Sequence, residues 1–520
     1  MKTYENQALK EYIETRLKLS DITNTRFCQK ELNDFLNKNS VRICGLYGLR
    51  RTGKSTMIYK AIENLEYKDC LYINCSNNDD YMDIENILNE TKARYVFIDE
   101  VTKVNGFLSL SSSLSDNYPD KKIVITGTDS ASLLLAKEDE LYDRIDLIHT
   151  TYIPYAEYNH LLKKPIEDYI RYGGTLTDGE KIYNEDNLEE YSNTAITSNI
   201  CHSIRNTNGE LSYKRLYDLY LNGSLESAIN KTIEKNARQF LINVINGSFD
   251  KSHQFGSALE LVNKHSSSLS VEEKEIIRNW DKNDIYEYIC NHIQIQGKSD
   301  MNEKDIVLIT NFLKKLDVLD TTFEGQIIFT QSGMQYALTE ILLEAVIQSA
   351  EYQKLYPETQ KIVLDKITQD SFGHILENVI KKDIIECPEL TKMEIGHLDN
   401  TGNGEFDLYI INPDTHKAMV YEIKRSFIRA DKQVQHLRNE EFCKEFEKLH
   451  KCTIIEKGVI YQGENHVLED GILYHNAQDF LLNIPQKTIG LFQTDRNISL
   501  ENRQNNPKLT NEEVDFLEER

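Results

Sequence analysis

Short apolar runs alternate with helical stretches in the first third of the chain. After amphipathic helices expected within residues 6–38, the apolar runs are VRICGLYG, KDCLYINCS, RYVFIDEV and KKIVITGTD. Strands that alternate with helices predict a parallel sheet with helices on both faces. We therefore expect an α/β domain over residues 1–165.

The pattern becomes mainly helical between residues 166 and 345. Helices are expected at IEDYIRYGG, YSNTAITSNICHSI, ALELVNKH, NDIYEYICNHI and NEKDIVLITNFLKKLDVL, where apolar residues repeat at intervals of three and four. A strand pair is expected next, around TTFEGQIIFT. Helices followed by a small hairpin are typical of a winged helix. A plain helical subdomain fits the same pattern, so both interpretations stay open.

Residues 346–482 show a third arrangement, in the order helix, three strands, helix, strand. This order predicts a separate C-terminal α/β domain. The polar stretch 483–520 is expected to be a mobile tail. A chain of 520 residues exceeds the about 250 to 300 residues that one core usually supports, which agrees with several domains.

Composition narrows the functional classes. The formal net charge of −24 argues against nucleic-acid binding through a general basic surface, and a local basic groove stays compatible with it. No apolar run approaches the about 18 residues that span a bilayer, and the N-terminus lacks the apolar stretch of a signal peptide. We therefore expect a cytoplasmic protein without a membrane partner. The nine cysteines never form a Cys-x-x-Cys pair, which favours reduced thiols and no zinc site.

One segment has the spacing of a P-loop and lies between an apolar strand and a helical stretch. In such a loop, backbone N–H groups surround phosphate oxygens at the positive end of a helix. Lys54 is expected to reach the β- and γ-phosphates, and Ser55 to bind magnesium. The sequence thus predicts ATP with magnesium as the cofactor. The residues expected to contact the nucleotide are Gly48, Leu49, Arg50, Arg51, Thr52, Gly53, Lys54, Ser55 and Thr56.

A second apolar strand delivers two carboxylates. Tyr95 to Ile98 are followed directly by Asp99 and Glu100. Asp99 would complete the magnesium site, and Glu100 would polarise the attacking water. This pair favours ATP hydrolysis over binding alone.

Four positions are candidates for sensing or stabilising the γ-phosphate. Asp129 follows the strand KKIVIT and is the candidate sensor. Arg144 is a candidate transition-state cation for the nucleotide of its own or a neighbouring subunit. Arg50 and Arg51 are alternatives for that role, and a surface position fits each arginine equally well.

Residues 404–426 predict a β-hairpin with a tight turn at Pro413-Asp414-Thr415-His416. A turn centred between Asp414 and Thr415 places Asp407 opposite Glu422, and Glu405 opposite Lys424. One apolar face is then expected to contain Phe406, Leu408, Ile410, Met419, Tyr421 and Ile423, and the other Tyr409, Ile411, Ala418 and Val420.

Two carboxylates that face each other in a covered sheet repel, and a divalent cation removes that repulsion. Asp407 and Glu422 are therefore candidate ligands for magnesium or manganese, with Lys424 beside them to orient water or bind phosphate. Glu377, on the preceding helix, is a further candidate ligand. The alternative is an ordinary hairpin with a Glu405–Lys424 ion pair. A candidate phosphate-binding patch near these residues comprises Lys424, Arg425, Arg429, Lys432 and Arg438.

The chain resembles the prokaryotic family of AAA-type ATPases that carry a C-terminal domain of the PD-(D/E)xK nuclease superfamily. The resemblance covers residues 40–470 and rests on GLRRTGKST, YVFIDEV, ITGTDS, YDRIDLIHTTYIPYAEYNHLL, IEDYIRYGG, EFDLYI and VYEIKRS. Two positions depart from it. Asp129 stands where the family usually has serine or asparagine, and Arg144 follows an aspartate where the family usually has glycine.

The resemblance implies a P-loop ATPase core, a helical or winged-helix middle region and a C-terminal α/β restriction-endonuclease-like domain. It assigns Glu377, Asp407, Glu422 and Lys424 to the nuclease motif, with Gln433 at the polar helix position that follows. The first hypothesis is an ATP-hydrolysing switch coupled to a metal-dependent nuclease or nucleic-acid-binding domain. The second is a regulatory ATPase whose nuclease-like domain binds a partner without cutting. The third is a purely structural C-terminal domain. A homo-oligomer is compatible with all three.

Overall fold

The computed structural model separates into two compact units, Met1–Ile375 and Leu376–Arg520, and each unit is described by itself. No helix in the part of the chain described below is both long and apolar enough to cross a membrane. The cysteines in that part are free thiols. The structure describes residues 1–492 except 20–22, 39–42, 77–78, 108–109, 111–112, 115–116, 128–132, 134–143, 177–178, 184, 207–212, 249–269, 273–274, 276–301, 323–324, 349, 355–356 and 401–403.

The first unit begins with a mixed sheet in the strand order β1-β3-β4-β5-β2-β6. The strands β2 to β5 run parallel, as predicted, and β6, which the apolar pattern did not reveal, pairs parallel with β2. The edge strand β1 pairs antiparallel with β3. Because its sequence KTYE has no apolar alternation, the hydrophobic pattern did not reveal it. The strands are β1 (Lys2–Glu5), β2 (Ile43–Tyr47), β3 (Cys70–Asn74), β4 (Tyr95–Asp99), β5 (Lys122–Thr126) and β6 (Ile145–His149).

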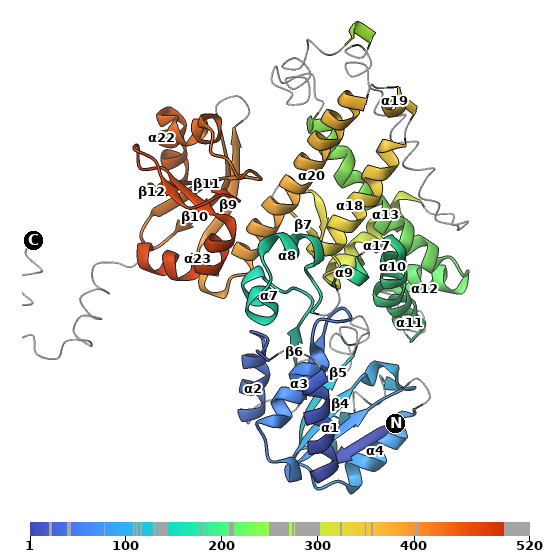
Figure 1. Cartoon of the computed structure of the whole chain (residues 1–520). Coiled ribbons are helices and arrows are strands. Elements are labelled where there is room, and N and C mark those ends of the chain that lie inside the picture. Colours follow the sequence, from blue (N-terminus) through green and yellow to red (C-terminus); the bar gives the residue numbers. More distant parts are fainter. Residues whose placement is uncertain are drawn as a thin grey trace, which may run out of the picture. The chain divides into compact units, whose positions relative to one another are not determined.

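Alternate residues of these strands enter two separate cores, so that helices cover both faces of the sheet (Figure 1). Cys44, Phe97 and Val124 face α1 (Asn6–Leu19), α2 (Gln29–Asn37) and α3 (Lys54–Glu63). Their neighbours Ile43, Ile98 and Ile125 pack on the opposite face, where α4 (Tyr81–Glu90) contributes Ile84 and Leu88. The two faces confirm the predicted α/β layering.

The middle of the chain is largely helical, and its elements from α9 (Gly179–Ile182) onwards contribute to one core. The predicted strand pair is present, since Leu319 pairs antiparallel with Phe329. The stretches ALELVNKH and NDIYEYICNHI lie outside the described residues. The elements are α7 (Tyr155–Leu162), α8 (Ile166–Tyr172), α9 (Gly179–Ile182), α10 (Glu185–Ser192), η3 (Asn193–Thr197), α11 (Ser198–Asn206), α12 (Lys214–Leu221), α13 (Leu225–Ser248), α17 (Glu303–Lys315), β7 (Leu319–Thr321), β8 (Ile327–Phe329), α18 (Ser332–Ile347) and α19 (Ala350–Gln353).

The C-terminal unit contains a second, mixed sheet in the order β13-β14-β12-β11-β10-β9. The predicted order of helix, three strands, helix and strand is present, and β13, β14 and α23 follow it. Between Leu408 and Asn412 the hairpin register is as predicted, because Leu408 pairs with Tyr421 and Asn412 with Lys417. The helix α20 (Pro357–Ile385) begins in the first unit and ends in this one. The other elements are β9 (Glu394–Asn400), β10 (Gly404–Asn412), β11 (Lys417–Lys424), η6 (Asp431–Val434), α21 (Gln435–Arg438), α22 (Glu440–His450), β12 (Thr453–Tyr461), β13 (His466–Val467), β14 (Leu473–Asn476) and α23 (Ala477–Phe492).

Two expectations for this unit are wrong. Phe406 packs in the same core as Tyr409, Val420 and Phe442 rather than with Leu408. A register shift between Phe406 and Tyr409 in the pairing with β9 interrupts the alternation of faces. The predicted polar tail also starts too early, since α23 continues to Phe492 and buries Phe480, Leu481 and Ile484.

Candidate functional site

The P-loop joins β2 to α3 and is glycine-dependent at both ends. Gly48 has φ = 146°, and a Cβ there would come within 2.3 Å of Thr150 Oγ1. Gly53 has φ = 91°, in the left-handed region, directly before α3. A side chain at either position would be strained. These constraints fix the loop against the end of β6.

Threonine hydroxyl groups directly after β6 are hydrogen-bonded to the P-loop. The Thr52 Oγ1 and Thr150 Oγ1 atoms are 2.8 Å apart, and Thr52 Oγ1 also donates to Leu49 O at 2.9 Å. Thr151 Oγ1 accepts from Leu49 N at 3.1 Å. Thr52, Thr150 and Thr151 are all buried. The loop is thus pre-shaped by side chains that the P-loop spacing alone did not identify.

Lys54 points back over the loop that precedes it. Its Nζ donates to Gly48 O at 2.7 Å and to Leu49 O at 2.8 Å. Burial lowers the pKa of Lys54 to about 8, and the charges of Glu100 and Asp99 oppose this change. A desolvated ammonium at the mouth of a glycine loop is well placed to exchange these carbonyl oxygens for phosphate oxygens.

A buried arginine, Arg26, is hydrogen-bonded to the backbone of the P-loop. Arg26 donates from Nη1 to Thr52 O in the loop and, at 3.2 Å, to Thr150 O. Its Nε forms an ion pair of 2.7 Å with Glu157 on α7. One side chain therefore ties the segment before α2, the P-loop, the end of β6 and α7 together.

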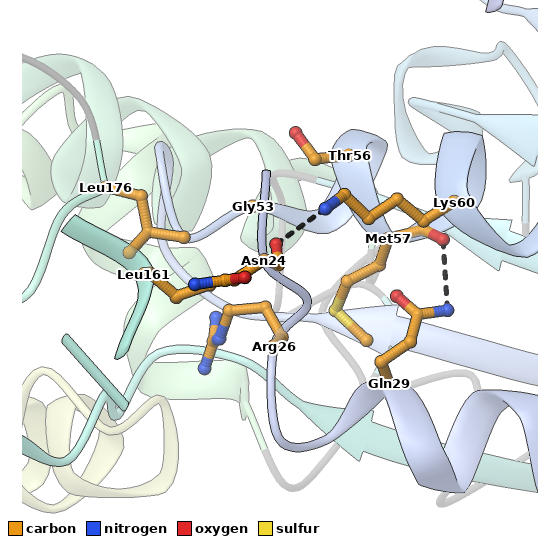
Figure 2. A pocket seen from close by; sticks show the side chains of 9 residues that line it. All are labelled: Asn24, Arg26, Gln29, Gly53, Thr56, Met57, Lys60, Leu161 and Leu176. Carbon is orange, nitrogen blue, oxygen red and sulfur yellow. Dashed lines mark hydrogen bonds between the residues drawn. The ribbon is translucent and has the colours of Figure 1, made fainter. Parts of the chain in front are cut away.

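A small cavity lies beside Arg26 and the first turn of α3 (Figure 2). Lys60 closes one side of it by donating to the carbonyl oxygens of Thr23 and Asn24 at 2.7 and 2.6 Å. Gln29 donates to Met57 O at 3.2 Å on the same side. The lining residues are Asn24, Arg26, Gln29, Gly53, Thr56, Met57, Lys60, Leu161 and Leu176.

Asp99 ends β4 in a buried position and is held by two hydroxyl groups. Tyr72 OH donates to Asp99 Oδ2 at 2.8 Å, and Thr126 Oγ1 donates to Asp99 Oδ1. Burial and the Asp99 charge raise the pKa of Tyr72, so its hydroxyl stays protonated and keeps donating. Neither partner was identified from the sequence.

Glu100 adopts a left-handed backbone conformation with φ = 60°. Its backbone N–H donates to Thr126 Oγ1 at 3.2 Å. Its carboxylate forms an ion pair of 3.2 Å with Lys103, and both side chains are partly exposed. The two carboxylates thus differ in their surroundings. Asp99 is buried and held by two hydrogen bonds, whereas Glu100 is partly exposed to solvent.

The remaining predicted residues of this site divide into three groups. Ser55 and Thr56 lie in the first turn of α3, as expected. Asp129 lies outside the described residues. Arg144 precedes β6, which runs parallel to β2, so Arg144 lies at the opposite edge of the sheet from the P-loop of its own chain.

The arginines inside the P-loop are contacted through their backbone by the middle helical region. Leu176 N donates to Arg51 O at 2.9 Å. Tyr191 OH is 3.4 Å from Arg50 O and 3.3 Å from Gln331 Oε1 at the start of α18. Leu49 itself is buried in the core of that region. The loop is therefore in direct contact with helices far away in sequence.

The C-terminal unit brings together three of its predicted residues. Lys424 Nζ lies 3.0 Å from Asp407 Oδ2 and 2.7 Å from Glu422 Oε2. Ile423 N also donates to Asp407 Oδ2 at 2.6 Å. Although burial opposes the charged form, the two carboxylates raise the pKa of Lys424. The ammonium thus already neutralises the repulsion that a cation was expected to relieve.

Two neighbours complete this carboxylate cluster. Burial of its carboxyl and the nearby Asp407 charge raise the pKa of Glu405 to about 8, although the residue as a whole is exposed. His436 Nδ1 lies 2.9 Å from Glu422 Oε1, and this hydrogen bond raises the pKa of His436. Gln433, which the resemblance assigns to the polar position after the motif, accepts hydrogen bonds from Ala430 N and Tyr474 OH.

Glu377 forms an ion pair of 2.5 Å with Lys381 on its own helix. Burial raises the pKa of Asp407, but the Lys424 charge, the hydrogen bonds from Ile423 N and Lys424, and the Lys381 charge together lower it. Within the described residues, no group of three or more histidine, cysteine or acidic side chains is arranged to hold a metal. Asp407 and Glu422 thus lie close to each other, and the Lys424 ammonium forms an ion pair with both.

Comparison with known proteins identifies the domain that contains the P-loop. Residues 40–159 match the AAA_14 family, described as an AAA domain. No curated protein sequence matches the chain. The matched segment contains the P-loop with Lys54, the strand β4 with Asp99, and the strand β6. The chain therefore contains an AAA-type P-loop ATPase domain.

Solved structures give weaker likenesses. The Walker-type ATPase PABY2304 of Pyrococcus abyssi is 14% identical, over 60% of this chain and 94% of that one, with a TM-score of 0.28. AMPPCP-bound DnaA from Aquifex aeolicus is 13% identical, over 65% and 93%, with a TM-score of 0.24. The ORC2 protein of Aeropyrum pernix is 10% identical, over 66% and 96%, with a TM-score of 0.26. Scores of this size carry no argument about function.

Proposed function

We propose that the protein binds ATP with magnesium at the P-loop, hydrolyses it, and uses the nucleotide state to govern a C-terminal domain that acts on nucleic acid. The observation that carries the ATPase part is the buried Lys54 ammonium, 2.7 and 2.8 Å from carbonyl oxygens of its own loop. Phosphate oxygens would replace these carbonyl groups and neutralise a charge that burial disfavours.

Each residue of the ATPase site has one proposed role. The backbone of the loop from Gly48 to Thr56 binds the phosphates, and Lys54 binds the β- and γ-phosphates. Ser55 and Asp99 hold magnesium, which supplies charge neutralisation at the transferred phosphate. Glu100 orients and polarises the attacking water. Asp129 acts as the sensor of the γ-phosphate.

Arg144 is proposed to act on the nucleotide of a neighbouring subunit in a homo-oligomer. Its place at the amino end of β6 favours this role over one at its own P-loop.

The proposed domains are an ATPase core (1–165), a helical and winged-helix-like region (166–345), a nuclease-like domain (346–482) and a C-terminal tail. The antiparallel pair β7–β8 after α17 supports the winged-helix assignment. The order α20, β9, β10, β11, α22, β12 supports the restriction-endonuclease-like assignment. The P-loop site between β2 and α3 does not depend on the winged-helix assignment or on the nuclease-like assignment.

The chemistry of the C-terminal donors fits a hard cation, because carboxylate oxygens are the ligands that magnesium and manganese prefer. Asp407 and Glu422 would hold the metal, with Glu377 as a further ligand, and the metal would polarise a phosphodiester. Lys424, whose side chain is 36% exposed, would turn from the carboxylates towards phosphate or water.

A regulatory ATPase with an inactive nuclease-like domain is the alternative function. The observation that favours it is the Lys424 ammonium between Asp407 and Glu422, because it satisfies both carboxylates without a metal. In that case the C-terminal domain binds a partner and cleaves nothing.

The ATPase proposal is tested with Lys54→Ala and Glu100→Gln. Lys54→Ala should abolish ATP binding measured by calorimetry. Glu100→Gln should bind ATP as the wild type does and release no phosphate. The control Lys68→Ala removes an exposed lysine just after α3 and should change neither quantity. ATP binding by Lys54→Ala equal to the wild type would contradict the assignment.

The nuclease proposal needs a separate experiment. Purified wild type is incubated with single- and double-stranded DNA and RNA in magnesium or manganese, alongside Glu422→Ala and Lys424→Ala. Cleavage that both changes abolish supports the nuclease. Cleavage that persists in both, or an absence of cleavage by the wild type on all four substrates, favours the regulatory alternative.

A further inference from the structure

The loop after β11 exposes two consecutive large apolar side chains. Phe427 and Ile428 are 67% and 75% exposed. Among the large apolar residues that the structure describes as exposed, they are the only two that follow each other directly in sequence. Single exposed apolar residues are common on protein surfaces, whereas an adjacent pair that includes an aromatic ring is a candidate contact surface.

Hydrogen bonds hold this loop in a defined shape. Ser426 Oγ donates to Ile428 O at 2.7 Å and accepts from Ile428 N at 3.0 Å. Gln462 N donates to Ser426 O at 2.9 Å, and Gln433 Nε2 donates to Ile428 O at 3.2 Å. The backbone that carries the two apolar side chains is therefore tied to β12 and to η6, and the side chains are presented to solvent.

The same loop starts at the carboxylate cluster. Ser426 N donates to Lys424 O at 2.9 Å, and Lys424 Nζ bridges Asp407 and Glu422. Phe427 thus follows the candidate catalytic lysine by three positions, across a turn of fixed geometry. The exposed apolar pair therefore begins three residues after Lys424.

The charge of the loop indicates what that ligand is. Residues 425–432 carry the basic Arg425, Arg429 and Lys432 against the acidic Asp431, in a chain of net charge −24. A basic loop on an acidic protein attracts a polyanion locally. An exposed aromatic residue with an arginine two positions before it and another two positions after it is suited to a polyanion that also offers flat apolar faces, as unstacked bases do.

We propose that Phe427 stacks on, and Ile428 packs against, an unpaired base of a nucleic acid strand, next to the phosphate that reaches the carboxylate cluster. This inference rests on the proposed action of the C-terminal domain on nucleic acid and adds a preference for single strands, junctions or frayed ends. In a closed duplex the bases are stacked on each other, so the apolar pair gains a partner only where a base is free.

The test compares wild type with the double variant Phe427→Ala/Ile428→Ala. Binding is measured by fluorescence anisotropy in EDTA, so that no cleavage occurs, with a labelled single-stranded oligonucleotide and a blunt duplex of the same length. The variant should lose about tenfold in affinity for the single strand and less than threefold for the duplex. The control Val467→Ala removes a side chain that is 62% exposed on β13 of the same unit and should change neither affinity.

A second variant reports on stacking directly. Phe427→Trp should keep the single-strand affinity, and its indole fluorescence should be quenched when the oligonucleotide binds. Wild-type affinity in the double variant, with no quenching in Phe427→Trp, would overturn the inference and leave the proposed nucleic-acid function standing. Failure of the wild type to bind either oligonucleotide would overturn both. Binding of wild type, but not the double variant, to phosphatidylserine vesicles without oligonucleotide binding would assign the loop to a lipid surface instead.

Discussion

Arg26 and Glu157 form an ion pair of 2.7 Å between side chains that are only 4% and 3% exposed. The residues are 131 positions apart, and the pair closes the segment before α2 onto α7 beneath the P-loop. Arg26 also donates to the P-loop carbonyl of Thr52. The pair is therefore a support of the nucleotide loop as well as of the fold.

Arg26→Met should destabilise the protein by about 3–5 kcal/mol, because it leaves the Glu157 carboxylate buried without its partner. The measurement is urea unfolding of the purified protein, with ATP affinity determined in parallel. Arg26→Met/Glu157→Met should recover part of the stability, since no buried charge is left. ATP affinity should stay reduced in both variants because the Thr52 contact is lost.

The exposed Lys164–Asp168 pair provides the control. Its atoms are 3.4 Å apart, and its side chains are 48% and 30% exposed. Asp168→Asn should change stability by less than about 1 kcal/mol. If Arg26→Met changes stability no more than Asp168→Asn does, the buried pair contributes no more to stability than the partly exposed pair.

Replacing Thr126 should reduce ATP hydrolysis more than ATP binding. Thr126→Val keeps the side-chain volume but removes the donor to Asp99 and the acceptor for Glu100 N. A hydrogen bond to a charged group contributes about 1.5–3 kcal/mol, so we expect phosphate release to fall by about tenfold or more while ATP affinity changes by less than about threefold. Thr3→Val, an exposed threonine on β1 of the same sheet, is the matched control. A loss of ATP affinity as large as the loss of turnover would contradict this division.

The P-loop could be predicted because all of its residues are contiguous and its spacing follows from phosphate geometry. The hairpin register could be predicted because a tight turn determines every pair on both strands. Arg26, Tyr72 and Glu157 could not, since each is a single polar residue whose partner lies in another element. Thr126 left a partial signal, because it ends the predicted strand KKIVIT, and parallel strands of one sheet end at the same edge.

Local backbone irregularities limited the prediction of the C-terminal unit. Alternation assigns Phe406 to the face of Leu408, and the register shift after Phe406 reverses that assignment. The ion pair between Glu377 and Lys381 had a visible signal, because residues four apart on a helix are neighbours. The contact between His436 and Glu422 had none, since it depends on how the chain turns between β11 and α22.

Asp305 should make stability depend on pH in the acid range. Arg215 donates to both Asp305 oxygens at 2.7 Å, and these hydrogen bonds lower the pKa of Asp305. A carboxyl with a lowered folded-state pKa stabilises the fold above its unfolded pKa of about 4, and the contribution disappears as the pH falls through the folded-state pKa. Asp305→Asn should therefore lower the melting temperature at pH 7, and the difference from wild type should shrink below about pH 4.

Thermal melts at pH 7, 5, 4 and 3 check this sign. Glu340→Gln, which neutralises an exposed carboxyl on α18, should follow the wild type at every pH. A difference between wild type and Asp305→Asn that grows on acidification would mean that the charged form of Asp305 does not stabilise the fold.

Lys424→Met should convert the C-terminal cluster into one that needs a cation. Without the ammonium, the buried Asp407 and Glu422 lose the cation that they share, and their mutual repulsion is relieved only in part by Ile423 N and His436. We expect the variant to melt at a lower temperature than wild type in EDTA, and to recover with magnesium or manganese. At a metal concentration 100 times Kd the recovery amounts to about 2.7 kcal/mol. Lys417→Met, at the other end of β11, is the control and should show no such recovery.

The outcome decides between the two functions proposed for this domain. A metal-dependent recovery that Glu422→Gln abolishes shows that the two carboxylates form a cation site once Lys424 moves away, as a nuclease requires. If the melting temperature of Lys424→Met is the same in EDTA and in either metal, Asp407 and Glu422 serve only as partners of Lys424. The hydrogen bonds from Ile423 N to Asp407 and between His436 and Glu422 then belong to a structural network, and the ATPase would act through binding by this domain rather than through cleavage.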